Sequence, residues 1–151
     1  MIPQIWRGCA VPPELLYDVE RDVWVRLEGD EAVVGMTDVA QTTCGKIVQI
    51  SWKHAGRTVA RGKPLVVIES AKWVGPFPSP LTAEIVADNR AAFDADILLA
   101  NRDPYGDGWL VRLRPTDLAG ERFGLVDGAA AFEHYRRFVD EHDIHCFRCA
   151  G

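Results

Sequence analysis

The sequence lacks any hydrophobic run long enough to cross a membrane. The longest apolar stretches, such as residues 64–68, are only a few residues long, whereas a spanning helix needs about 20 apolar residues. The start, Met1 to Arg7, also lacks the basic segment followed by an apolar segment that marks a secretory signal. We therefore expect a soluble, cytoplasmic protein with no membrane partner.

Positive charge is also scarce. The chain has 17 lysines and arginines against 22 aspartates and glutamates, and its net charge is −5. Binding to nucleic acid phosphates requires a basic surface, so the composition argues against a nucleic acid partner. A mildly acidic surface suits solubility and docking to basic patches on other proteins.

Cysteine is too sparse for a disulfide scaffold, because only four occur in 151 residues. Cys44 lies in a segment predicted to be structured, where we expect a small buried residue. Cys9, Cys146 and Cys149 lie near the two ends of the chain.

The length and the balance of residues predict one globular domain. The chain is 48% hydrophobic and 26% charged, which is typical of soluble globular proteins. We expect a single domain over residues 1–151, with its core at about 12–140 and a C-terminal tail at 142–151.

Most of the predicted elements are short strands separated by turns that contain glycine or proline. Residues 23–27 and 31–36 flank a hairpin turn at Gly29-Asp30, and residues 46–52 alternate between apolar and polar side chains. Many short strands of this kind predict a small β-sandwich or flattened barrel with helices around its ends. The other predicted strands are residues 65–69, 73–74, 81–87 and 109–113.

Three helices are predicted from their capping residues. Thr37-Asp38 would begin a short helix that ends at Gly45, and Asn89 would cap a helix over residues 89–99. Asp127 would cap a helix over residues 128–141, with Phe132, Tyr135 and Val139 on one face.

Lys72 lies between two predicted strands, in Glu69-Ser70-Ala71-Lys72, which places its amine at the tip of a hairpin. A carrier needs such a position, because a modifying enzyme and several partners must all reach the same group. Most exposed turn lysines have no such role, and Lys63 in its own turn is an equal candidate by spacing alone. The spacing therefore leaves the two lysines open.

The segment Glu69-Ser70-Ala71-Lys72 resembles the lipoyl-attachment motif of glycine cleavage H-proteins. Other stretches resemble the same family in the same order: residues 17–30 around Trp24, residues 34–41, the strand at 45–48, and residues 101–110. The resemblance implies a hybrid barrel-sandwich fold, mainly β with flanking helices (α+β). It also implies lipoate bound covalently to Lys72, with Glu69 and Ser70 helping the ligase to recognise the hairpin or only shaping the turn.

A protein of this kind is a substrate of other enzymes and has no catalytic residues of its own. The implied partners are a lipoate ligase or lipoyl transferase, glycine decarboxylase, aminomethyltransferase and dihydrolipoamide dehydrogenase. The cofactor supplies the reactivity, and the protein supplies presentation and docking.

Two segments depart from the glycine cleavage pattern. Trp73-Val74-Gly75-Pro76 follows the lysine where small and acidic residues are usual, and Asp22-Val23 precedes Trp24 where the family usually has His-Glu. The Lys-Trp-Val-Gly-Pro sequence and the Gly-Cys pair at Cys9 resemble the H-like lipoate-binding proteins of bacterial sulfur oxidation. That branch implies a sulfur-containing cargo and a heterodisulfide-reductase-like complex as partner. We favour this interpretation, with glycine cleavage as the alternative.

The C-terminal tail, which contains His142, His145, Cys146 and Cys149, admits three interpretations. It could bind zinc through these four side chains, although they are crowded and we assign no metal site. It could hold a Cys146–Cys149 dithiol, as in a small thiol oxidoreductase, with Cys9 as a further redox candidate. Alternatively it is a flexible tail. The protein could also be an interaction module that no ligase modifies.

Overall fold

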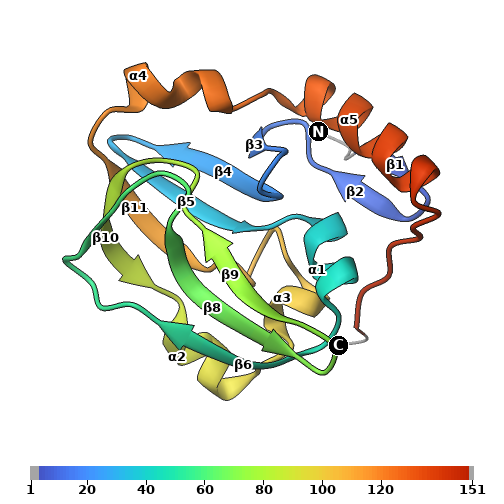
Figure 1. Ribbon diagram of the computed structural model, residues 1–151, viewed down its shortest axis with the longest axis horizontal. Helices are drawn as coiled ribbons and strands as arrows, with labels where there is room; N and C mark the ends of the chain where they lie inside the picture. Colours follow the sequence, from blue (N-terminus) through green and yellow to red (C-terminus); the bar gives the residue numbers. More distant parts are fainter. Residues whose placement is uncertain (1–3, 150–151) are drawn as a thin grey trace.

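The computed structural model describes residues 4–149, which form three antiparallel sheets. The largest sheet has six strands in the order β3-β4-β5-β11-β10-β7, and a smaller sheet has the order β6-β8-β9. Figure 1 shows the small sheet as a separate layer beside the large one, with α5 over the N-terminal strands β1 and β2. The strands are β1 Gln4–Trp6, β2 Cys9–Val11, β3 Leu16–Asp18, β4 Val23–Glu28, β5 Glu31–Met36, β6 Ile47–Trp52, β7 Thr58–Val59, β8 Pro64–Ser70, β9 Val74–Pro78, β10 Ala83–Asp88 and β11 Val111–Pro115.

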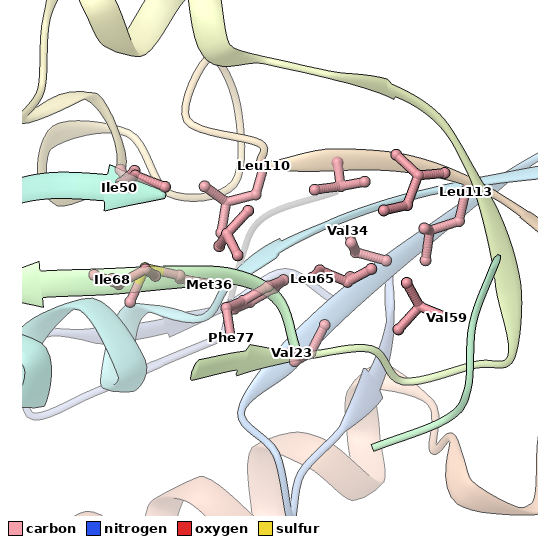
Figure 2. Close-up of a cluster of buried hydrophobic side chains, with 14 of the residues drawn as sticks. Val23, Val34, Met36, Ile50, Val59, Leu65, Ile68, Phe77, Leu110 and Leu113 are labelled. Atoms are coloured by element: carbon pink, nitrogen blue, oxygen red, sulfur yellow. The ribbon is translucent and has the colours of Figure 1, made fainter. Parts of the chain in front are cut away.

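The main core lies between the two larger sheets. Figure 2 shows Ile68 and Phe77 of the small sheet in the same cluster as Val34 and Leu113 of the large one. All four side chains are buried, and each contributes about 1.5–3 kcal/mol of hydrophobic stabilisation. The predicted sandwich with helices around it is therefore the observed architecture.

The β4–β5 hairpin confirms the prediction for residues 23–36. Val23 pairs with Met36 and Glu28 pairs with Glu31, so the strands are in register up to the Gly29-Asp30 turn. Gly29 has φ +63°, a backbone conformation that glycine adopts without steric cost.

Helix α1 (Asp38–Cys44) begins and ends at the predicted residues. The side chain of Thr37 accepts a hydrogen bond from the backbone N–H of Ala40 at 3.1 Å, and Gly45 is the C-cap. Cys44, the last helical residue, is buried as expected.

The predicted helix over residues 89–99 is wrong in its length and its cap. Two short helices occupy this region, α2 (Arg90–Ala95) and α3 (Leu99–Arg102), because the chain turns to extended backbone at Asp96. Asn89 makes no side-chain capping bond; its amide instead donates to the carbonyls of Asp107 and Trp109. Those backbone carbonyls lie far along the chain, so the local capping pattern could not reveal them.

Helix α5 (Gly128–Glu141) packs on a second hydrophobic cluster. Asp127 accepts the capping bond from Ala130 as predicted. Tyr135 and Val139 are buried with Trp24 and Tyr17, whereas Phe132 is only partly buried. Helix α4 (Leu118–Glu121) and a 3₁₀ turn, η1 (Arg122–Gly124), precede α5 and were not predicted.

The C-terminal segment is held against the body of the protein. A disulfide joins Cys146 to Cys9 of β2, and the Cys146 N–H donates to the carbonyl of Arg7 at 2.9 Å. Gln41 of α1 donates to the carbonyl of Phe147 at 2.7 Å. Figure 1 shows this segment running from α5 past α1. The expectation of a flexible tail is therefore wrong for residues 144–149; residues 150 and 151 of the predicted tail lie outside the described residues.

The disulfide also corrects the two chemical interpretations of the tail. Cys146 is bonded to Cys9, so the predicted Cys146–Cys149 dithiol is absent and Cys149 is a free thiol. The zinc interpretation loses one of its four ligands for the same reason. Between residues 4 and 149, no group of three His, Cys, Asp or Glu side chains is arranged to hold a metal ion. No helix in this range is long and apolar enough to cross a membrane.

Candidate functional site

Lys72 lies at the tip of the hairpin between β8 and β9. The Ser70 N–H donates to the carbonyl of Trp73 at 2.7 Å, which leaves Ala71 and Lys72 as the two residues of the turn. Both are exposed. The structure therefore presents Lys72 to solvent at the end of two paired strands, as predicted.

Ser70 and Glu69 have different surroundings. Ser70 is 5% exposed, and its hydroxyl donates to the carbonyl of Cys44 at 2.7 Å and accepts from the N–H of Lys72 at 3.3 Å. Ser70 thus ties the hairpin to the end of α1 and shapes the turn. Glu69 is exposed on the outer face of the sheet, so it is the better placed of the two for contact with a ligase, and that role stays a prediction.

Gly45 lies directly beneath the lysine side chain. It has φ +85°, and a Cβ added there would meet Cε of Lys72 at 2.8 Å. The absence of a side chain at Gly45 therefore lets the aliphatic part of Lys72 lie against the backbone. The left-handed φ gives a second reason for glycine at this position.

Asn101 of α3 fixes the two segments that support the hairpin. Its side-chain oxygen accepts from the N–H of Ile47 at 2.9 Å, and its amide donates to the carbonyl of Gly45 at 2.8 Å. Asn101 is 2% exposed, so water cannot replace these bonds. It therefore holds the start of β6 to the end of α1.

Replacing Asn101 by alanine should lower the free energy of unfolding by about 2–4 kcal/mol, because the buried N–H of Ile47 and the partly buried carbonyl of Gly45 lose their partner. The measurement is urea denaturation of Asn101→Ala beside Asn89→Ala. Asn89 also bonds two backbone groups but is partly exposed, so we expect a loss of only about 1 kcal/mol there. Equal losses in the two variants would contradict the role of Asn101.

A cavity of about 340 Å³ adjoins the hairpin. Trp73 and Phe77 line it from the hairpin, and Cys44 lines it from α1. Burial raises the pKa of the Cys44 thiol, although the Ser70 hydrogen bond and the Lys72 charge oppose this. Most of the lining is apolar, and its charged members are Arg21 and Asp22.

Asp22 stands where the sequence departs from the His-Glu pattern, and the structure places it in this cavity. It has φ +58°, and Tyr135 donates its hydroxyl to the carboxylate at 3.0 Å. Burial raises the pKa of Asp22 to about 6; the Tyr135 hydrogen bond lowers it, and the nearby Asp18 carboxylate raises it.

Asp22→Asn should stabilise the protein at neutral pH. The folded-state pKa of about 6 exceeds the ordinary value of 3.8, so the stability that Asp22 contributes is present below the lower value and is lost as pH rises through the higher one. Asparagine tolerates a positive φ and can still accept from Tyr135. The free energy of unfolding of the variant should exceed that of the wild type by about 1–2 kcal/mol at pH 7. Near pH 4 the two values should be equal. Urea denaturation across this range tests it, and a pH-independent difference would contradict it.

Lys63 and the cysteines are the remaining predicted site residues. Lys63 lies in the turn before β8, at the opposite end of that strand from Lys72, and does not line the cavity. Cys149 reaches the site only indirectly, because its N–H donates to the carbonyl of Asn101. Redox roles for Cys9, Cys146 and Cys149 stay predictions.

These features define a class of protein: a β-sandwich that presents one lysine on a tight hairpin beside an apolar cavity. A family model described as "Glycine cleavage H-protein" matches residues 15–139. The chain belongs to the glycine cleavage H-protein family.

Similar proteins support the assignment over nearly the whole chain. "Glycine cleavage system H protein 3" of Aquifex aeolicus is 41% identical, over 95% of this chain and 91% of that protein. "Probable glycine cleavage system H protein 2" of Sulfolobus acidocaldarius is 40% identical, over 93% and 95%. The crystal structure of a glycine cleavage system H protein from Mycobacterium marinum superposes with a TM-score of 0.71 at 30% identity, covering 83% of this chain and 98% of that one. The fold is thus the predicted H-protein barrel-sandwich.

Sequence reasoning missed Asn101, the cavity and the partner of Cys9. The sequence shows Asn101 only as part of the family-like stretch 101–110, and nothing local shows that its side-chain amide bridges Gly45 and Ile47. The Cys9–Cys146 pair is separated by 137 residues, and spacing cannot select such a pair from four cysteines.

Proposed function

We propose that this protein is a lipoyl carrier, with lipoate joined to Nζ of Lys72 by an amide bond. The observation that carries the proposal is the exposed amine of Lys72 on a two-residue turn, beside an apolar cavity. A swinging arm needs an attachment point that an enzyme can reach and a rigid base that defines where the arm starts. The Ser70–Cys44 and Asn101–Gly45 bonds supply that base.

The residues around Lys72 fit the group. When bound, lipoate supplies a dithiolane whose sulfurs exchange with thiols and carry cargo between enzymes. Trp73, Phe77 and Ile68 give the cavity an apolar wall next to the attachment point, suited to an alkyl chain and a sulfur ring. In this proposal the protein itself is not a catalyst.

The direct test is modification of the purified protein by a lipoate ligase with lipoate and ATP. The ligase would join the lipoate carboxylate to Nζ of Lys72, with release of AMP and pyrophosphate. We expect the intact mass to rise by one lipoyl group and peptide mapping to place it on Lys72. No mass increase with a ligase that modifies another H-protein in parallel would refute the proposal.

For the cargo, the comparisons favour the aminomethyl group of glycine cleavage over the sulfur intermediate favoured from the sequence. The relatives carry glycine cleavage names over nearly the full chain. The partners would then be glycine decarboxylase, aminomethyltransferase and dihydrolipoamide dehydrogenase.

A sulfur-containing cargo is the second candidate, with a heterodisulfide-reductase-like complex as partner. Its support is the Lys-Trp-Val-Gly-Pro sequence, since both Trp73 and Pro76 line the cavity. Mass spectrometry of the lipoylated protein after incubation with glycine decarboxylase and glycine separates the two. An added aminomethyl group supports glycine cleavage. An arm that stays unloaded and that, once reduced to its dithiol, accepts a sulfur atom from a persulfide donor, which leaves as a thiol, supports the second candidate.

A further inference from the structure

The segment from Lys46 to Pro80, which contains the small sheet and β7 of the large sheet, is positively charged in an otherwise acidic protein. Residues 46–80 contain all four lysines of the chain and two arginines, against the single carboxylate of Glu69, while the whole chain has a net charge of −5. The lysines lie at the two ends of the sheet. Lys46 precedes β6 and Lys72 follows β8 at one end, and Lys53 follows β6 and Lys63 precedes β8 at the other.

These lysines are available to a partner. Within residues 4–149, the ion pairs involve arginines and one histidine, and none joins a lysine to a carboxylate. Lys46, Lys63 and Lys72 are exposed, and Lys53 is half-buried. The carboxylates of the large sheet are in contrast already paired, as Glu31 is with Arg112 and Arg114.

Between the two ends, the outer face of the small sheet carries both polar and apolar side chains. The strand pairing aligns two exposed rows across β6, β8 and β9: Gln49, Glu69 and Val74, and then Ser51, Val67 and Pro76. Val74 is 64% exposed, Val67 is 40% exposed, and Trp73 beside Lys72 is 42% exposed. We call these two rows, with the four lysines at their ends, the attachment face.

We propose that the attachment face is the docking surface for the enzyme that joins lipoate to Lys72, and that this enzyme meets it with an apolar patch bordered by carboxylates. The inference rests on the proposed function and names the partner that binds first. Before modification the Lys72 amine extends no further than its own side chain, so the enzyme must contact the hairpin and its sheet. Later partners can be reached through the longer arm.

Charge would favour approach of the enzyme to the attachment face over approach to the rest of the protein surface. An acidic enzyme surface is repelled by most of a protein with net charge −5 and attracted by the lysine-bordered sheet, which raises the rate of productive encounters. The exposed valines and Trp73 then supply apolar area to bury. Glu69, the one carboxylate on the face, would lie opposite a donor on the enzyme.

The test measures kcat and KM for lipoate attachment to Lys53→Glu/Lys63→Glu and to Val74→Ser, together with the affinity of the unmodified protein for the enzyme by surface plasmon resonance. Arg137→Glu on α5 is the matched control, because Arg137 is exposed and lies outside the attachment face. None of these side chains is buried, and circular dichroism checks that each variant is folded.

We expect the double variant to raise KM and weaken binding by about ten-fold at low salt, with kcat within about two-fold of the wild type. Added salt should raise the KM of the wild type and reduce the difference in KM between the wild type and the double variant. Val74→Ser should raise KM by about three-fold, and Arg137→Glu should leave it unchanged. Normal modification of Lys72 with no effect of these variants would overturn the docking proposal but leave the carrier function standing. If the wild type is never modified, both proposals fail.

Discussion

Lys72→Arg should abolish lipoate attachment, whereas Lys63→Arg should leave its rate within about two-fold of the wild type. Arginine keeps the positive charge and the long side chain, but its guanidinium stays protonated at accessible pH and cannot act as the acceptor amine. Lys63 matches Lys72 in residue type and exposure and lies at the far end of β8. Comparing the two variants therefore tests whether the position of the lysine, and not only its side-chain chemistry, decides which lysine is modified.

The measurement is intact mass after incubation with ligase, lipoate and ATP, at several times. The Lys72→Arg protein should show no lipoyl group even at long times. A lipoyl group on the Lys72→Arg protein, or its loss from Lys63→Arg, would show that the hairpin does not select the lysine.

The second large effect is on stability: Cys146→Ser should lower the free energy of unfolding by about 4 kcal/mol. The disulfide with Cys9 spans 137 residues, so breaking it greatly enlarges the conformational freedom of the unfolded chain. Cys149→Ser is the matched control, because Cys149 is a free thiol in the same segment. We expect that variant within about 0.5 kcal/mol of the wild type.

Guanidinium denaturation without reductant tests this expectation, and with reductant the wild type should approach Cys146→Ser. The same variant should speed hydrogen exchange at the Cys149 amide, which donates to Asn101. Equal stability of the two serine variants would contradict the disulfide.

The elements that the sequence predicted well are those set by local physics. Thr37 caps α1 and Gly45 ends it because a side-chain acceptor and a glycine are the local solutions at helix ends. The 23–36 hairpin followed from alternation around Gly29-Asp30. In contrast, β1, β2, β3 and β7 have only two or three residues each. Strands this short depend on the neighbours that they pair with, which a single sequence does not reveal.

The site was predictable in part. By spacing alone, Lys72 and Lys63 are equal candidates for the attachment lysine. Only the resemblance at Glu69-Ser70-Ala71-Lys72 favours Lys72. The cavity was not predictable, because Trp73 and Cys44 line it from different elements. Asn89 illustrates the opposite error, since a residue in a capping position bonds to a distant loop instead.

The most direct test of the carrier function is the intact mass, with peptide mapping, of the protein purified gently from its native host. We predict a mass increment of one lipoyl group on Lys72. A further increment of an aminomethyl group or of sulfur atoms on the arm would identify the cargo. An unmodified Lys72 in growing cells would contradict the central claim and would turn attention to the disulfide-linked C-terminal segment.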